Sequence, residues 1–155
     1  MTRRSAGILL YRKSGGRLEV LLVHPGGPLW ARRDEGAWSI PKGEHGEAED
    51  PRACAGREFE EELGTPLPAG ALLELGSVQQ RGGKTVTAFA VEGDLDVDGV
   101  RSNSFSIEWP PRSGRQREFP EIDRAQWFAG DEARRKLIDA QVAFIDRLLD
   151  QLLAG

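Results

Sequence analysis

The sequence has almost no cysteine, because Cys54 is the only one among its 155 residues. A single thiol cannot form a disulfide within the chain, and a zinc site built from cysteine ligands is excluded. A chain with one cysteine suits a reducing compartment, so we expect a cytoplasmic location.

Long hydrophobic runs are missing as well. The first apolar segment, residues 6–11, is too short for the core of a signal peptide. No apolar stretch approaches the roughly 20 residues that a membrane-spanning helix needs. We therefore expect no membrane partner.

Positive charge is in deficit. The chain has 21 Lys and Arg residues against 25 Asp and Glu residues, giving a formal net charge of -4 and a pI of about 5.3. Such a protein does not rely on a broad basic surface, so we expect no nucleic-acid partner. An anionic ligand would need a bound cation to mediate its contact with this chain.

What is present is consistent with one globular domain over residues 1–155. Hydrophobic residues make up 39% of the chain and charged residues 30%, and the mean hydropathy is -0.46. This composition can fill one core and cover it with a polar surface.

Hydrophobic patterning predicts a mixture of strands and helices. Strands are predicted at 5–12, 18–24, 37–41, 71–80, 84–94, 104–109 and 122–128, with loops at 25–36 and 110–121. Apolar residues at helical spacing from about Asp131 onward predict an amphipathic C-terminal helix. Because strands and helices do not alternate regularly, we expect an α/β (α+β) sandwich and not a doubly wound parallel sheet.

A further helix is predicted over residues 51–63 by signals at both of its ends. Asp50 is suited to the N-cap, Pro51 to the first helical position, and Gly64 to the stop. The acidic residues that follow Pro51 therefore lie on a helix.

Two faces of this helix differ in chemistry. Phe59 and Leu63 are one turn apart and mark the face to be buried. Glu58, Glu61 and Glu62 share another face, where like charges repel by roughly 0.2–0.5 kcal/mol per pair. A hard cation such as Mg²⁺ or Mn²⁺ prefers carboxylate ligands and would turn this repulsion into coordination. Taken alone, the acidic run is explained more simply as a solvated helix face.

The wider spacing resembles the Nudix box, G-x5-E-x7-R-E-U-x-E-E-x-G-U, in which U is a bulky aliphatic residue. The stretch GEHGEAEDPRACAGREFEEELGT, residues 43–65, matches every fixed letter, with Phe59 at the first U and Thr65 departing from the second. The segments WSIPKGE before the box and EIDRAQWF near the C-terminus also resemble small bacterial Nudix hydrolases. The resemblance implies an α/β/α sandwich with a mixed central sheet, in which the box forms a loop–helix–loop.

The resemblance also implies a metal site. Members of the Nudix family hydrolyse nucleoside diphosphates linked to another group, with Mg²⁺ or Mn²⁺ as cofactor. The implied metal ligands are Glu58, Glu61, Glu62 and the backbone carbonyl of Lys42. Arg57 would orient these carboxylates and offset part of their charge.

The resemblance implies a general base and leaves two positions for it. It is either Glu58 in the box or a glutamate on a distal loop, where Glu121 is preferred to Glu118. For the distal pair the alternative is an exposed loop acid. Glu49 would brace the loop of the box, as a partner for Arg57.

Four residues are candidates for substrate binding: His24, Lys42, Arg81 and Lys84. His24 ends a predicted strand, so its alternative is a structural histidine. Arg81 and Lys84 flank two glycines, so their alternative is a charged hairpin.

The stretch RGGKTVTAFAVEGD resembles the corresponding part of diadenosine-tetraphosphate hydrolases, which bring a lysine to the phosphates. Those enzymes also carry a stacking aromatic residue in that strand, where this chain has Ala88 and Phe89. Trp30 and Trp38 are the other residues able to stack on a base, although Trp38 is expected in the core.

These observations favour a Nudix pyrophosphohydrolase that acts on a small nucleotide, either a dinucleoside polyphosphate or an NTP. A hydrolase of ADP-ribose or another sugar nucleotide is the first alternative. A non-catalytic nucleotide-binding module and an acidic Ca²⁺-binding helix are the others. A homodimer is compatible with all four hypotheses.

Overall fold

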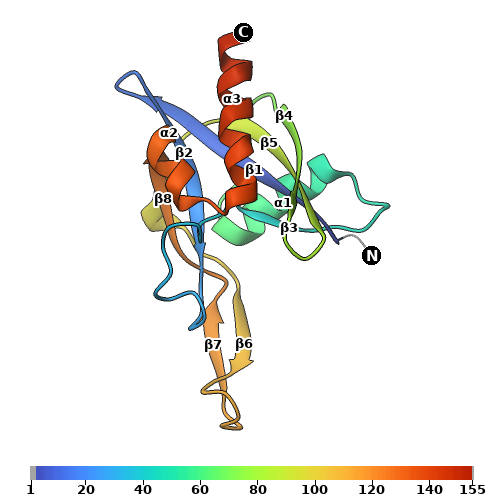
Figure 1. The fold of residues 1–155 in the computed structure, drawn as a ribbon, viewed down its shortest axis with the longest axis vertical. Helices are drawn as coiled ribbons and strands as arrows, with labels where there is room; N and C mark the ends of the chain where they lie inside the picture. Colours follow the sequence, from blue (N-terminus) through green and yellow to red (C-terminus); the bar gives the residue numbers. More distant parts are fainter. Residues whose placement is uncertain (1–2, 155) are drawn as a thin grey trace.

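The computed structural model describes residues 3–154, which form a mixed β-sheet with helices on both faces (Figure 1). The strands are β1 (Arg3–Ser14), β2 (Arg17–Pro25), β3 (Lys42–Glu44), β4 (Leu73–Gln80), β5 (Lys84–Glu92), β6 (Ser104–Glu108), β7 (Gln116–Pro120) and β8 (Ile122–Ala129). The helices are α1 (Pro51–Leu63), α2 (Gly130–Lys136) and α3 (Val142–Ala154), with single 3₁₀ turns η1 (Val97–Gly99) and η2 (Asp139–Gln141). The larger sheet has the order β4-β5-β1-β2-β8, with β3 also paired to β1, whereas β6 and β7 form a separate ribbon.

Strand β1 lies at the centre of the sheet and is buried on both faces. Ile8 and Leu10 pack in the layer that contains α1, whereas Leu9 and Tyr11 pack in the layer that contains α3. Successive side chains of a strand point to opposite faces, so a strand covered on both sides is a continuous apolar run. The expected α/β/α sandwich is confirmed, and its sheet is mixed because β1 runs parallel to β5 and antiparallel to β2.

Helix α1 has the predicted bounds. Gly64 ends it in the left-handed conformation (φ 68°) and donates its N–H to the Glu60 carbonyl. Phe59 and Leu63 are fully buried, as their spacing of one helical turn predicts. Asp50 occupies the N-cap position, but its side chain makes no capping hydrogen bond.

The predicted strand at 37–41 is wrong in its placement. Only isolated bridges occur there, between Val23 and Ser39 and between Trp38 and Leu137, and the regular strand β3 begins at Lys42. The ladder between β1 and β2 stops at Tyr11, and the segment that ends in β3 enters the opening between them. This insertion brings the start of the box to the middle of the sheet.

The predicted loop at 110–121 is also wrong, because it contains β7. Strands β6 and β7 form a ribbon that projects from the body of the molecule, which we call the arm (Figure 1). Phe105 pairs with Phe119, and Ile107 pairs with Arg117, so one face of the arm carries its apolar side chains. Before its last residue, strand β7 has one apolar residue, Phe119, among polar neighbours. The sequence therefore lacks the alternation of apolar and polar residues by which a strand is predicted.

The C-terminal helix is interrupted and not continuous from Asp131. Leu137 and Ile138 are extended between α2 and α3, where the Ile138 N–H donates to the Trp38 carbonyl at 2.9 Å. This contact ties the C-terminal region to the segment before β3. None of the helices within residues 3–154 is long and apolar enough to cross a membrane.

Candidate active site

Arg57 connects the carboxylates of the box. Its guanidinium hydrogen-bonds to the carboxylate of Glu49, which confirms the expected ion pair. It also lies 3.3 Å from Glu58 Oε1 and 3.8 Å from Glu61 Oε1. The hydrogen bonds that Arg57 donates to the carboxylates of Glu49 and Glu58 raise the pKa of Arg57. One cation therefore holds three acidic side chains in a defined arrangement.

The backbone at Gly43 is in direct contact with the Glu58 carboxylate. A Cβ atom built on Gly43 would lie 2.0 Å from the Glu58 carboxyl carbon, far inside any real contact distance. Gly43 is therefore required by this close approach. The Glu58 side chain is only 17% exposed, because it lies on the side of α1 that contacts β3.

Glu62 contacts the backbone of Lys42, the residue before Gly43. Its Oε2 accepts a hydrogen bond from the Lys42 N–H at 3.0 Å. Burial raises the pKa of Glu62 from 4.5 to about 8, with the hydrogen bond from Lys42 acting in the opposite direction. Burial also lowers the pKa of the Lys42 ammonium, which the nearby Glu62 charge partly offsets. The site therefore disfavours uncompensated charge on either group.

A cavity of about 310 Å³ collects residues from four separate parts of the sequence. Lys42, Glu62, Lys84 and Glu121 all line it. Its other walls include Val23, Pro25, Trp30, Ser39, Ile40, Gln80 and Ile138. We call it the catalytic cavity, after the role that we propose for it below. Two cationic and two acidic groups thus share one concave surface between β3, β5 and the start of β8.

His24 lies inside the protein and not at this surface. Its side chain is 0% exposed, with Nδ1 at 2.8 Å from Asp123 Oδ1 and Nε2 at 2.6 Å from the Arg33 carbonyl oxygen. Both ring nitrogens have partners within the chain, so the expected contact between His24 and a substrate phosphate is not available here. The structural alternative replaces it: His24 ties the loop after β2 to β8.

Two further candidates lie outside the catalytic cavity. Arg81 is exposed in the turn between β4 and β5, as the charged-hairpin alternative describes. Glu118 is exposed on β7, where it pairs with Ser106. Of the two distal acids, only Glu121 lines the catalytic cavity.

Sequence reasoning did not identify Gln141 and Gln80, which support the wall of the cavity. The Gln141 side chain is fully buried, accepts from the Ile40 N–H at 3.0 Å and donates to Gln80 Oε1 at 2.8 Å. A signal was available, because Gln141 is a polar residue on the apolar stripe of the C-terminal region, one turn before Ile145.

The family of the chain follows from comparison with known proteins. A family model described as the NUDIX domain matches residues 1–151. The chain belongs to the Nudix family. Among solved structures, a C. elegans Ap4A hydrolase binary complex is similar at 20% identity, with a TM-score of 0.70 over 99% of this chain and 100% of that one. Comparison with curated proteins gives no match.

Other Nudix structures are similar in fold. The NUDIX domain of Shewanella oneidensis NrtR, complexed with ADP ribose, has 13% identity and a TM-score of 0.64 over 98% of this chain and 89% of that one. The M. smegmatis Nudix hydrolase RenU has 22% identity and a TM-score of 0.55 over 97% of this chain and 86% of that one. Membership in the Nudix family supports a hydrolase that acts on pyrophosphate bonds.

Nudix hydrolases generally use divalent metal ions, and the donor chemistry of this site fits one. The carboxylates of Glu58, Glu61 and Glu62 are ligands for hard cations, and the buried Glu62 carboxylate would be stabilised by a positive charge. Within residues 3–154, no three His, Cys, Asp or Glu side chains are gathered closely enough to form a metal cluster. Arg57 and the Lys42 N–H pair with these carboxylates instead, so an ion would compete with them for the oxygen atoms.

Proposed function

We propose that this chain hydrolyses a phosphoanhydride bond in a small nucleotide, with Mg²⁺ or Mn²⁺ as cofactor. The observation that carries the proposal is the catalytic cavity, where Lys42 and Lys84 lie on the same surface as Glu62 and Glu121. Lysine ammonium groups bind phosphate oxygens, and a carboxylate can accept a proton from an attacking water. Hydrolysis of a pyrophosphate needs both functions within one site.

The box residues hold the metal in this proposal. Glu58, Glu61, Glu62 and the carbonyl of Lys42 are its ligands, and Arg57 orients the first two carboxylates through its contacts at 3.3 and 3.8 Å. A bound divalent ion supplies neutralisation of phosphate oxygens and lowers the pKa of water. The chain itself supplies fixed ligand geometry, because Gly43 and Arg57 restrict where the Glu58 carboxylate can lie.

Glu121 is the proposed proton acceptor. Its place in the lining of the catalytic cavity, together with Glu62, supports it over the exposed Glu118. Glu58 is the alternative, although its carboxylate is already held between Arg57 and the Gly43 backbone.

Dinucleoside polyphosphates and NTPs are the proposed substrates. Lys84, in the stretch that resembles diadenosine-tetraphosphate hydrolases, lines the cavity together with Lys42, and two cations suit a chain of several phosphates. ADP-ribose, with its shorter diphosphate, is the alternative. A non-catalytic binding module is disfavoured because all the glutamates of the box are present.

A substrate panel tests the proposal. The protein is incubated with Mg²⁺ or Mn²⁺ and with NTPs, diadenosine polyphosphates or ADP-ribose, and the products are identified. We expect turnover of a polyphosphate and its loss in Glu61→Gln, while the melting temperature is retained. Turnover of none of the compounds would overturn the hydrolase proposal, and faster turnover of ADP-ribose than of every polyphosphate would favour the alternative.

A further inference from the structure

A second cavity, of about 270 Å³, adjoins the catalytic cavity. One wall is the loop segment 25–30, the other is Phe105 and Ile107 of the arm, and Glu121 also lines it. We call it the apolar cavity. Pro25, Trp30 and Glu121 line both cavities, so the two are adjacent. A molecule bound along this shared wall contacts the lining of both cavities.

The walls of the apolar cavity are held by close backbone contacts. A Cβ atom on Gly27 would lie 2.8 Å from Phe105 Cζ, and one on Gly26 would lie 1.9 Å from the Pro120 carbonyl oxygen. The Gly26 N–H also donates to the Glu121 carbonyl at 2.9 Å. Glycines at 26 and 27 therefore let the loop lie directly against the base of the arm. The space between loop and arm is built by these contacts.

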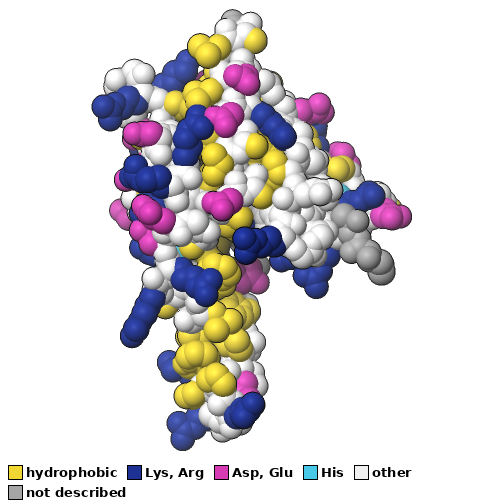
Figure 2. All heavy atoms as spheres, in the orientation of Figure 1, with side chains coloured by type: hydrophobic (Ala, Val, Ile, Leu, Met, Phe, Trp, Pro, Cys, Tyr) yellow, Lys and Arg dark blue, Asp and Glu magenta, His cyan; other side chains and the backbone are white. Residues whose placement is uncertain are grey.

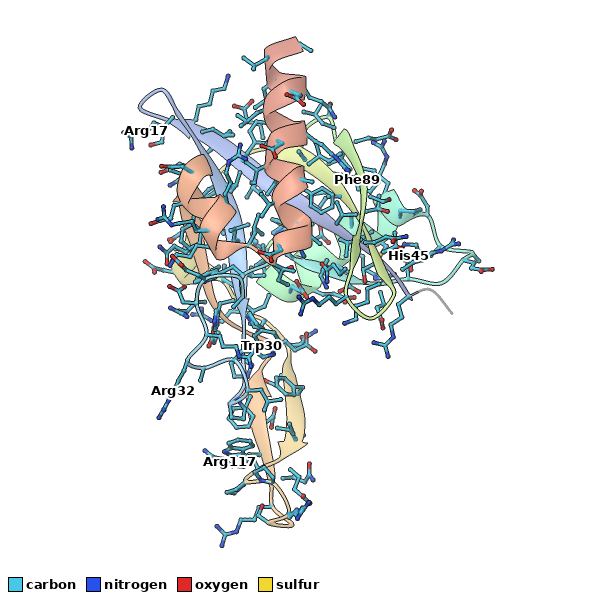
Figure 3. The ribbon with its side chains drawn as sticks, in the orientation of Figure 1. Arg17, Trp30, Arg32, His45, Phe89 and Arg117 are labelled. Carbon is cyan, nitrogen blue, oxygen red and sulfur yellow. The ribbon has the colours of Figure 1, made fainter. Side chains whose placement is uncertain are left out.

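The chemistry of the two cavities differs. The catalytic cavity contains Lys42 and Lys84, whereas the lining of the apolar cavity, all within residues 3–154, includes no lysine or arginine. Figure 3 shows Trp30 between the body and the arm, and Figure 2 shows hydrophobic side chains gathered along the arm. Leu29, at the edge of the cavity, is 63% exposed. Phosphates suit the first cavity, and an uncharged planar group suits the second.

We infer that the apolar cavity binds the base of the nucleotide whose phosphates lie in the catalytic cavity. This inference rests on the proposed function and assigns the part of the substrate that the loop and the arm contact. Trp30 and Phe105 offer aromatic surfaces, and aromatic rings bind planar heterocycles by stacking and apolar contact. The arm is thus part of the substrate site, and its projection from the body serves to form one wall.

Recognition by stacking tolerates different bases, because every base has a π-face. The one ionisable side chain in the described lining of the apolar cavity is Glu121, the proposed proton acceptor, so no other charged group there reads the edge of a base. We therefore expect kcat/KM for ATP, GTP, CTP and UTP to agree within about fivefold, while inorganic tripolyphosphate is worse by about tenfold or more.

Variants of the two walls test the inference. Phe105→Ala removes an aromatic surface on the arm, and Trp30→Leu removes the one on the loop. Each should raise KM for the nucleotide about tenfold or more, as loss of one stacking contact does, with a smaller effect on kcat. The matched control is Phe119→Ala. Phe119 is the cross-strand neighbour of Phe105, with 6.1 Å between their ring centroids, but it does not line the cavity. The control should leave KM within about twofold of the original value, because it removes no stacking surface.

A binding measurement separates this inference from the hydrolase proposal. AMP is titrated into the protein in EDTA, and binding is measured by calorimetry. We expect Phe105→Ala to lower the affinity for AMP and Phe119→Ala to leave it unchanged. Such binding would support the base site even if no substrate were hydrolysed. Trp30→Phe should keep most of the affinity, since it retains an aromatic face.

Three results would overturn the base site. The first is tripolyphosphate turnover equal to that of ATP, and the second is an unchanged KM in both wall variants. The third is a dimer in sedimentation that Phe105→Ala dissociates without any change in AMP affinity, which would assign this face to a second copy of the chain.

Discussion

Replacing Glu62 by glutamine should make the metal-free protein more stable above neutral pH while it removes turnover. In the structure, burial raises the pKa of Glu62 from 4.5 to about 8. The folded state therefore binds the Glu62 proton more tightly than the unfolded state does. Below about pH 4.5 both states are protonated and the residue carries no penalty. Between pH 4.5 and about 8 the unfolded state has lost the proton, so the stability of the original protein falls as pH rises.

The size of this effect follows from the same values. A tenfold change in proton affinity corresponds to about 1.4 kcal/mol, so the full rise corresponds to at most about 5 kcal/mol above pH 8. Buried sites relax and admit water when they ionise, so we expect roughly 1–3 kcal/mol to be measured. Glutamine does not ionise, and its amide oxygen can still accept from the Lys42 N–H, which Glu62 binds at 3.0 Å.

The assay is urea denaturation in EDTA at several values between about pH 5 and pH 9, with linear extrapolation to water. The difference in unfolding free energy between Glu62→Gln and the original protein should grow across this interval. Glu61→Gln is the matched control, because the Glu61 side chain lies on the same helix and is 50% exposed. A difference that stays constant with pH for Glu62→Gln would refute the reasoning, as would equal growth in the control.

Three further predictions concern the same site. Gly43→Ala should lower kcat about 100-fold or more, because its methyl group displaces the Glu58 carboxylate, with roughly 1–3 kcal/mol of lost stability. Gly46→Ala is the control, since nothing lies within 4 Å of a Cβ there, and equal losses in both variants would contradict this explanation. Glu121→Gln should lower kcat about 10²–10⁴-fold, as loss of a general base does, while Glu118→Gln keeps most activity. The opposite ranking would assign the base elsewhere. Mg²⁺ in excess should raise the melting temperature of the original protein, and Glu58→Gln should reduce that increase. A melting temperature independent of Mg²⁺ would remove the proposed metal site.

The elements that the sequence predicted well are those with local signals. Helix α1 has Pro51 at its start and Gly64 at its end, so both bounds could be placed without knowledge of the fold. The apolar run of β1 also needed no partner to be recognised. The interruption after α2 could not be predicted, because Leu137 leaves the helix to pair with Trp38, a residue from a distant part of the chain.

The residues of the candidate site also differ in whether a local signal or only the fold brings them together. The spacing of the box pointed to Arg57 and Glu58, because one helix fixes their relation. The catalytic cavity brings together residues as distant as Lys42 and Glu121, and only the folded sheet does so. His24 lies near the end of a strand as the sequence predicts, but its partner Asp123 lies on β8, and only the pairing between β2 and β8 brings the two together.

The loop after β2 is anchored at two points. At one end the Gly26 N–H is bound to Glu121, and further along the Arg33 carbonyl is bound to the buried His24. The span between these anchors, residues 27–32, carries Trp30 into both cavities. We expect its sequence, apart from Gly27, to be exchangeable, so that the wall of the proposed base site changes while the anchors stay in place. A graft confined to residues 28–32 keeps Gly27 against Phe105 and leaves the glutamates of α1 untouched, so it is the natural unit for altering which nucleotides the protein accepts.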